Sequence, residues 1–412
     1  MVEKNDVSLE TQDSVDVKRN VPSLRFPKFK EKWKTLILDD VIKEFVNGQT
    51  PSRNHDEYWK GNIPWLSSGE LNYGFINDSI EKITEKGQKS TNLRILPRNT
   101  FLIAIFGLEA TGTRGSCGIL NIPSTISQAC MALIPYEEKL KMNFLYYWYN
   151  KVGDLYGVKY TQGTKQQNFN IELLKKLSIT LPSNLEEQEK IANFLSLIDK
   201  KIELLEKTLV LYQRYKTYFL DTLINKNNSP LEKMSNIIRI TSSKNKNNEN
   251  LLVLSINNKL GFISQNDQFD NHKVASEDTS NYKIVEKDDF AYNPARINVG
   301  SIARLRNYNK GIVSPMYIVF KIDKDKVNLN YFENYIDSYD FRLNVLKRLE
   351  GSVRLVLSAE ALKNIMIPLP NLNEQEKIGN FLEYNNKRIQ LTNKKLEELK
   401  EYKKGLLQKM FC

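Results

Sequence analysis

The chain has 412 residues, which at about 150 residues per domain indicates two to three domains. Its 60 Lys and Arg residues exceed its 49 Asp and Glu residues, and the net charge of +11 favours an anionic partner such as nucleic acid, although a solvated basic surface would also produce it. Three cysteines, a polar start and the lack of any long apolar run argue against a disulfide framework, a signal peptide and a membrane span, so we expect a soluble cytoplasmic protein.

The first half of the chain begins with a polar segment and continues with a mixed α/β pattern. We expect residues 1–20 to be flexible and residues 21–185 to form a first globular domain. Its predicted elements are strands at 63–66, 100–106, 129–134 and 176–181 and a helix at 143–152.

Two loops of this domain are rich in glycine and polar residues, namely 107–118 (GLEATGTRGSCG) and 159–168 (KYTQGTKQQN). Arg and Lys can bind guanine bidentately, and Asn and Gln suit adenine. We therefore predict that these loops read DNA, with solvated turns as the alternative. The candidate DNA-binding residues are Thr111, Thr113, Arg114, Lys159, Thr161, Gln162, Thr164, Lys165 and Gln167.

Residues 186–226 are expected to be a long helix. Apolar residues recur there in alternating steps of four and three, the heptad spacing of a coiled-coil seam. Over 187–224 such a helix would be about 57 Å long at 1.5 Å per residue. An ordinary amphipathic helix on a separate domain is the alternative. The seam residues are Ile191, Leu195, Ile198, Ile202, Leu205 and Leu209.

A second mixed α/β domain is expected at residues 227–370, with two loops of the same character at 293–301 (NPARINVGS) and 348–354 (RLEGSVR). Its predicted elements are strands at 251–256, 289–292, 301–305 and 312–322 and a helix at 331–348. The candidate DNA-binding residues of this domain are Asn293, Arg296, Asn298, Ser301, Arg304, Arg348, Ser352 and Arg354.

A second long helix is expected at residues 371–412, and its start repeats the start of the first. Eight of the nine residues of Glu187-Gln-Glu-Lys-Ile-Ala-Asn-Phe-Leu recur 187 residues later from Glu374 onward, so the chain contains an internal duplication. A buried Asn at a seam position often fixes register. The seam residues of this helix are Ile378, Leu382, Asn385, Ile389, Leu396 and Leu399.

Weaker matches extend the duplication upstream at similar shifts. Residues 74–76 match 261–263, residues 100–101 match 289–290, Ser127 matches Ser314, and residues 163–164 match 351–352. Because the second helix starts from the second domain and buries its seam by folding back along the first helix, we expect an antiparallel pair. The predicted fold is α+β, with two mixed α/β domains joined by two long antiparallel coiled-coil helices in pseudo-twofold symmetry.

Catalytic motifs are scarce in the chain. It has only two histidines, His55 and His272, and neither a Cys-x-x-Cys pair nor a P-loop, so we expect neither a catalytic residue nor a metal ligand. Glycines 112, 115 and 118 lack the spacing of a dinucleotide loop, and residues 293–296 (NPAR) lack the second proline and the aromatic of the amino-methyltransferase motif.

Each of the two predicted α/β domains ends in the same order of features: a Gly-Thr or Gly-Ser loop, a strand that ends in Leu-Pro, a Glu-Gln-Glu-Lys-Ile turn and then a long helix. With this order of features the chain resembles the specificity (S) subunits of type I restriction–modification systems. The resemblance extends from about Trp33 to the end of the sequence. The resemblance implies two target-recognition domains, each reading one half of a bipartite DNA sequence, and helices that set the gap between the half-sites.

The resemblance also implies partners and cofactors. The helices would dock two modification (methyltransferase) subunits, which bind S-adenosylmethionine and methylate adenine, one on each strand. Restriction subunits would supply translocase and nuclease activity with ATP and Mg, and this chain would carry no cofactor. The alternatives are the recognition subunit of a related restriction enzyme that cuts on both sides of its site, and a coiled-coil scaffold that binds no DNA.

Overall fold

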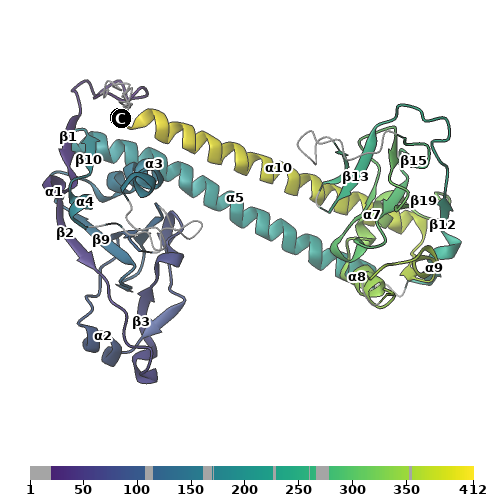
Figure 1. Ribbon diagram of the computed structural model, residues 1–412, viewed down its shortest axis with the longest axis horizontal. Coiled ribbons are helices and arrows are strands. Elements are labelled where there is room, and N and C mark those ends of the chain that lie inside the picture. The colour runs from purple at the N-terminus through teal and green to yellow at the C-terminus, as the bar shows by residue number, and fades with distance from the viewer. Residues whose placement is uncertain are drawn as a thin grey trace, which may run out of the picture. The chain divides into compact units, whose positions relative to one another are not determined.

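The computed structural model describes residues 20–106, 115–160, 169, 171–225, 229–258, 260–265, 278–351 and 355–412, without the side chains of 157–160 and 223–225. The chain forms two compact units (Figure 1). The first unit comprises the residues up to Leu204 together with Leu396–Cys412, and the second comprises Leu205–Lys395. Each long helix therefore contributes one part to each unit. Within the described part of the chain, no helix has the length and apolar character that crossing a membrane requires.

The first unit is built on a five-stranded sheet with the strand order β2-β9-β6-β7-β4, beside a three-stranded sheet, β5-β3-β8, and the strand pair β1-β10. Its strands are β1 (Lys34–Ile37), β2 (Ile42–Asn47), β3 (Trp59–Leu66), β4 (Gly74–Ile76), β5 (Glu81–Ile83), β6 (Phe101–Ala104), β7 (Cys117–Leu120), β8 (Thr125–Ile126), β9 (Cys130–Pro135) and β10 (Ser178–Leu181). Its helices are α1 (Leu38–Val41), α2 (Glu85–Thr91), α3 (Met142–Tyr160), α4 (Ile171–Lys175), the first part of α5 (Leu185–Asn225) and the end of the last helix, α10 (Leu372–Met410), from Leu396 onward.

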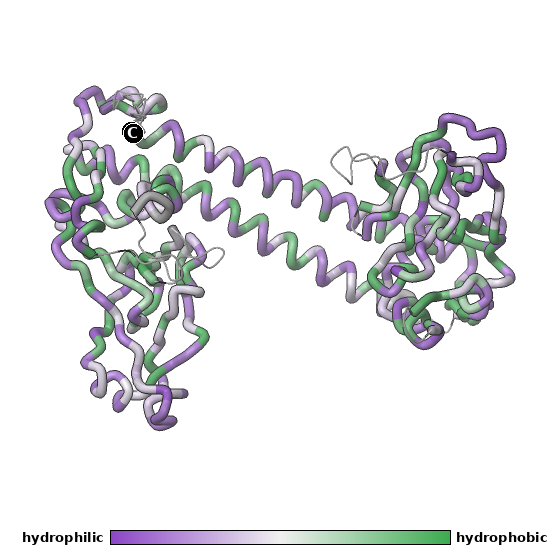
Figure 2. Tube along the Cα trace, in the orientation of Figure 1, coloured by the Kyte–Doolittle hydropathy of each residue, from purple (hydrophilic) through white to green (hydrophobic). Residues whose placement is uncertain are grey.

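The core of the first unit lies between its large sheet and α3. Every residue of β6 and β7 is buried, and such continuous apolar runs are typical of strands covered on both faces. From α3, Phe144 and the run from Leu145 to Tyr149 enter the same core, together with Trp33. Figure 2 shows hydrophobic and hydrophilic residues alternating along the long helices α5 and α10.

The second unit contains two four-stranded sheets, β12-β19-β16-β17 and β14-β13-β18-β15, and the strand pair β11-β20. Its strands are β11 (Leu231–Lys233), β12 (Ile238–Thr241), β13 (Val253–Asn257), β14 (Gly261–Ser264), β15 (Lys283–Glu286), β16 (Phe290–Tyr292), β17 (Ile302–Arg304), β18 (Lys310–Val313), β19 (Ile318–Ile322) and β20 (Met366–Pro368). Its helices are the last part of α5, α7 (Leu329–Tyr335), α8 (Tyr339–Leu346), α9 (Ala359–Lys363) and the first part of α10 (Leu372–Met410).

The duplication seen in the sequence extends through both units. The order β2-β9-β6-β7 of the first unit returns as β12-β19-β16-β17 in the second. The turn in which Cys130 N–H donates to Ser127 returns in Tyr317 and Ser314, with 3.0 Å in both bonds. The match of residues 74–76 with 261–263 has no such counterpart, because β4 pairs with β7 whereas β14 pairs with β13.

Two predicted elements are interrupted in the second unit. The predicted strand at 312–322 is two strands, β18 and β19, because Pro315 between them has no N–H to donate to a ladder. The predicted helix at 331–348 is two helices, α7 and α8. The Ser338 hydroxyl accepts a hydrogen bond from Phe341 N–H and caps the second helix, so the chain turns at this residue.

The two long helices closely match their expected ranges, with 41 residues in α5 and 39 in α10. Within the second unit, the Phe219 and Phe381 rings lie 4.9 Å apart, and the Tyr212 hydroxyl accepts a hydrogen bond from Arg388. The residue numbers of the contacting partners fall along α5 as they rise along α10, so the two segments run antiparallel within this unit. In the first unit, Lys403 forms an ion pair of 2.6 Å with Asp199.

The seam residues of both helices lie on the buried or half-buried side. Those of α5 are Ile191, Leu195, Ile198, Ile202, Leu205 and Leu209, and those of α10 are Ile378, Leu382, Asn385, Ile389, Leu396 and Leu399. Asn385 is 8% exposed, so the polar seam position is indeed enclosed within the second unit.

Candidate nucleic-acid interface

Described residues beside the two candidate loops of the first unit are joined to each other. The backbone N–H of Phe169 donates to the carbonyl of Ile105 at 2.8 Å, so the segment before residue 107 lies against the segment after residue 168. The other end of the first loop is fixed at Gly115, which has a φ of 70°. A Cβ there would lie 2.4 Å from the backbone nitrogen of Asp154, so only glycine allows this approach to α3.

Most candidate residues of the first unit lie outside the described part of the chain. They are Thr111, Thr113, Arg114, Thr161, Gln162, Thr164, Lys165 and Gln167. Lys159 belongs to the last turn of α3, and its side chain is not described. The structure therefore brings together the described residues that flank the two loops, and the roles of these candidates stay predictions.

The second unit joins its two loops in the same way. The backbone N–H of Leu357 donates to the carbonyl of Pro294 at 3.0 Å, and the Leu357 carbonyl also accepts from the Tyr292 hydroxyl at 3.2 Å. Leu357 and Pro294 follow Phe169 and Ile105 by 188 and 189 residues, so this bond is the repeat of the first. The duplicated frame thus presents a pair of loops in each unit.

The loop at 293–301 separates into a buried base and an exposed tip. Asn293 is buried, and its side-chain oxygen accepts from Ala295 N–H at 3.0 Å. The backbone of Ser301 closes the loop, since its N–H donates to the Arg296 carbonyl and its carbonyl accepts from Asn293 N–H. Arg296 and Asn298 are exposed, and no hydrogen bond or ion pair of their side chains occurs among the described residues. The tip is therefore the part of this loop that is available to a ligand.

Arg304 and Arg348 bind groups of the protein itself. The Arg304 side chain is 12% exposed and donates to Asp288 at 2.5 Å and to Glu333 at 3.3 Å. Arg348 donates to the carbonyl and side chain of Asn344 at 3.0 and 2.9 Å. Ser352 and Arg354 lie outside the described residues.

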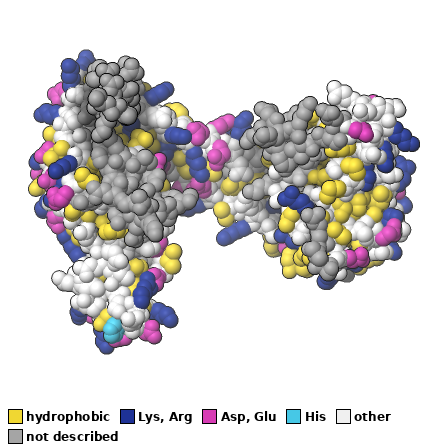
Figure 3. Space-filling model, in the orientation of Figure 1, with side chains coloured by type: hydrophobic (Ala, Val, Ile, Leu, Met, Phe, Trp, Pro, Cys, Tyr) yellow, Lys and Arg dark blue, Asp and Glu magenta, His cyan; other side chains and the backbone are white. Residues whose placement is uncertain are grey.

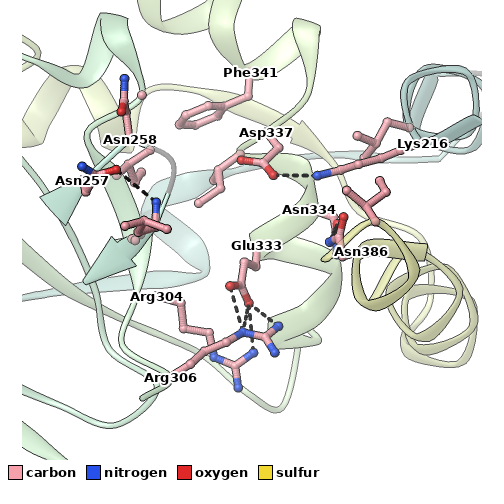
Figure 4. Close-up of a pocket in the computed structure, with 18 of the residues that line it drawn as sticks. Lys216, Asn257, Asn258, Arg304, Arg306, Glu333, Asn334, Asp337, Phe341 and Asn386 are labelled. Atoms are coloured by element: carbon pink, nitrogen blue, oxygen red, sulfur yellow. Dashed lines mark hydrogen bonds and ion pairs between the residues drawn. The ribbon is translucent and has the colours of Figure 1, made fainter. Parts of the chain in front are cut away.

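A polar cleft of about 1040 Å³ lies beside this loop, wholly within the second unit. Ile297, Val299 and Gly300 of the loop line it, facing α7, α8, α10 and the hairpin of β13 and β14. In Figure 4, Lys216 reaches Asp337 from α5, and Arg304 and Arg306 converge on Glu333. These ion pairs neutralise the carboxylates of the cleft, which would otherwise repel a phosphate.

Side-chain amides dominate the remaining polar lining of the cleft, and an amide can both donate to and accept from base edges. Asn386 donates to Asn334 at 3.1 Å, and Asn258 donates to the Val299 carbonyl at 3.4 Å. The amide residues of the lining are Gln213, Asn257, Asn258, Asn307, Asn334, Asn386, Gln390 and Asn393. Sequence reasoning did not find them because they come from five separate segments and share no spacing.

On the face drawn in Figure 3, the described basic and acidic side chains are intermixed over both units. Among the described residues, no group of three or more His, Cys, Asp and Glu side chains is arranged to hold a metal ion. The candidate interface of the second unit is therefore the tip of the loop at 293–301 together with the amide-lined cleft beside it.

The architecture defines a duplicated protein in which one α/β frame presents paired loops twice. The model of the type I restriction modification DNA specificity domain matches residues 30–211 and again residues 231–401. These two matches cover most of the chain, which therefore belongs to the family of type I restriction–modification DNA specificity domains.

Curated relatives agree with this family. The chain is 32% identical over 205 residues to the specificity subunit of the type I restriction enzyme MjaIX of Methanocaldococcus jannaschii, covering 47% of this chain and 45% of that protein. It is 28% identical over 210 residues to the EcoR124I/EcoR124II specificity subunit of Escherichia coli, and this match covers 49% of this chain and 50% of that protein. The match thus spans about half the length of these two relatives. The MjaVIII specificity subunit of M. jannaschii is 23% identical over 423 residues, and this match covers 94% of this chain and 93% of that protein.

Solved structures share the fold. The S subunit of a type I restriction–modification system from M. genitalium has a TM-score of 0.65 at 16% identity and covers 95% of this chain and 99% of its own. A chain from a study of complex assembly in a type I system has a TM-score of 0.53 at 13% identity, covering 92% and 97%.

Proposed function

We propose that the chain is the specificity subunit of a type I restriction–modification complex, with one half of a bipartite DNA target read by each unit. One observation carries this proposal: the bond from Phe169 to Ile105 recurs as the bond from Leu357 to Pro294 and joins two loops in each unit. The loops it joins differ in sequence between the units. A constant frame with different loops is what two different half-sites require.

In this proposal α5 and α10 separate the half-sites and dock two modification subunits. Those subunits bind S-adenosylmethionine and methylate adenine, and restriction subunits with ATP and Mg join them to cut unmodified DNA. The chain itself contributes recognition and no catalytic group. At 1.5 Å per residue α5 is about 60 Å long, so the gap between the half-sites is below about 18 base pairs at 3.4 Å per pair.

A gel-shift experiment with the chain alone and with its modification subunit tests the proposal. We expect the complex to shift a duplex that carries the target and to survive an excess of unrelated duplex. Its affinity should also fall steeply with salt, because phosphate contacts release counterions. Equal competition by unrelated DNA would contradict the proposal and would favour the alternative of a scaffold that binds no specific sequence.

A further inference from the structure

Two buried glutamines occupy the same place at the start of the two long helices. Gln188 in α5 and Gln375 in α10 are 187 residues apart, within the segment where the repeat is nearly perfect. Their exposed fractions are 0% and 1%. A buried amide has to be hydrogen-bonded, because an unpaired one would cost free energy on folding.

Gln188 bonds three backbone groups of the first unit. Its Nε2 donates to the carbonyls of Lys139 at 3.0 Å and Pro182 at 2.9 Å. Its Oε1 accepts from the N–H of Lys141 at 2.8 Å. The amide thus joins the first turn of α5 to the Leu-Pro turn before it and to the segment that enters α3.

Gln375 makes the same three bonds in the second unit. Its Nε2 donates to the carbonyls of Lys326 at 3.0 Å and Pro370 at 2.8 Å, and its Oε1 accepts from the N–H of Asn328 at 2.8 Å. Lys326 and Asn328 are the repeat equivalents of Lys139 and Lys141. Because every partner is a backbone group, the domain sequence can change without loss of the bonds.

The start of each long helix, where it meets its domain, is called the junction below. In the first unit a second set of contacts also holds the junction. Glu187 is 1% exposed and accepts from Arg25 at 2.6 and 2.8 Å and from the Trp33 ring nitrogen at 3.2 Å. Its equivalent in the second unit, Glu374, is exposed, and its carboxylate accepts only a long bond of 3.4 Å from Asn371 among the described residues. The junction of the second unit therefore depends more on its glutamine.

We propose that Gln188 and Gln375 are positioning residues that hold each recognition domain at one angle on its own long helix and thereby fix the gap length that the complex accepts. This role rests on the proposed function, since the gap has meaning only if both units read DNA. One base pair moves a half-site by about 3.4 Å, so a rigid junction rejects a gap that is wrong by one pair.

The test compares methylation by the complex of this chain with its modification subunits on three duplexes. They carry the mapped half-sites with the native gap, one pair fewer and one pair more. Wild type should prefer the native gap by at least about 100-fold, the scale of loss from a misplacement of about 1 Å. Gln375→Met removes all three bonds at similar volume, and its preference should fall to roughly tenfold or less.

Two further variants give the comparison its controls. Leu362 of α9 is fully buried and makes none of the three bonds of Gln375, so Leu362→Ala should lower methylation equally on all three duplexes. Gln188→Met should relax the gap preference only slightly, because Glu187 still holds Arg25 and Trp33. The double variant Arg25→Ala/Gln188→Met should relax it as far as Gln375→Met does.

The outcomes separate the inference from the proposed function. If Gln375→Met and the double variant keep the wild-type gap preference and only lose activity, as Leu362→Ala does, the positioning role is overturned. If Gln375→Met does not fold, the double variant in the first unit carries the same test. If wild type itself methylates all three duplexes alike or none, the proposed function fails first.

Discussion

At the scale of single residues, two arginines of the second unit that look alike in the sequence have different surroundings. Arg304 is enclosed by Asp288, Asn330 and Glu333, whereas Arg296 extends from an exposed loop tip. An enclosed arginine stabilises the fold, because removing it takes away the hydrogen bonds that it donates to half-buried carboxylates. An exposed arginine at a loop tip is free to contact phosphate or guanine.

We expect Arg304→Ala to lower the free energy of unfolding by about 2 kcal/mol, the scale of hydrogen bonds to charged groups, because Lys324 and Arg306 remain beside Asp288 and Glu333. Urea denaturation followed by circular dichroism measures this change. Arg296→Ala is the matched control, which should leave stability unchanged and weaken DNA binding by the complex. The reverse pattern, with Arg304→Ala stable and Arg296→Ala unfolded, would refute this assignment.

The carboxylates around Arg304 and Arg306 should also make the stability of the second unit depend on acid. Burial alone would raise the pKa of Asp288, but hydrogen bonds from Arg304 and Lys324 outweigh it and hold that pKa below 3.8. Burial would likewise raise the pKa of Glu383, but the attraction and hydrogen bond of Arg306 outweigh burial and hold that pKa below 4.5. Both groups bind fewer protons in the folded state than in the unfolded state.

The stability from these two groups is therefore complete above unfolded pKa values of about 3.9 and 4.3, and it is lost as pH falls through the lowered folded values. Asp289 acts in the opposite direction, because burial raises its pKa and its contribution is lost as pH rises. We expect the difference in urea midpoint between wild type and Arg304→Ala to shrink below pH 4. A difference that stays constant from pH 7 to pH 3 would contradict the role given to Asp288.

At the scale of elements, the buried strands β7 and β9 of the first unit each carry a cysteine. Burial raises the pKa of the Cys130 thiol to about 12 and also raises that of Cys117. Cys412 is partly exposed, and burial raises its pKa to about 11. Reaction with a disulfide reagent requires both access and the thiolate.

We therefore expect one thiol to react slowly in the native protein at pH 8 and two more to react only when urea opens the first unit. Labelling with a chromogenic disulfide reagent counts these thiols, and Cys412→Ser should remove the native reaction. Three thiols reacting at one rate without urea would show that β7 and β9 are not enclosed.

The helices and many strands could be predicted because their signals are local. A heptad spacing places Ile191 and Leu195 on one side of a helix without knowledge of any partner. The predicted strand at 312–322 and the predicted helix at 331–348 ran across Pro315 and Ser338, although proline and a capping serine are themselves local signals of a break. The pairing of β2 with β9, the enclosure of Arg304 and the shared amide lining of the cleft depend on contacts between distant segments, which no local pattern records.

At the scale of the whole molecule, the second recognition domain should be exchangeable. The strands β11 and β20 pair with each other at its base, so an exchange of residues 234–364 keeps both strands and the whole of α10. Replacing this segment by that of another family member should change one half-site and leave the other half-site and the gap unchanged. Sequencing of methylated DNA from the host would show both. A change in both half-sites would contradict independent reading.

The most direct measurement maps methylated adenines across the genome of a host that expresses this chain with its modification subunit. We expect a bipartite target whose two half-sites are separated by fewer than about 18 base pairs, with one methylated adenine on each strand. A continuous single-part target, or methylation that is the same without this chain, would contradict the conclusion that two units read two half-sites.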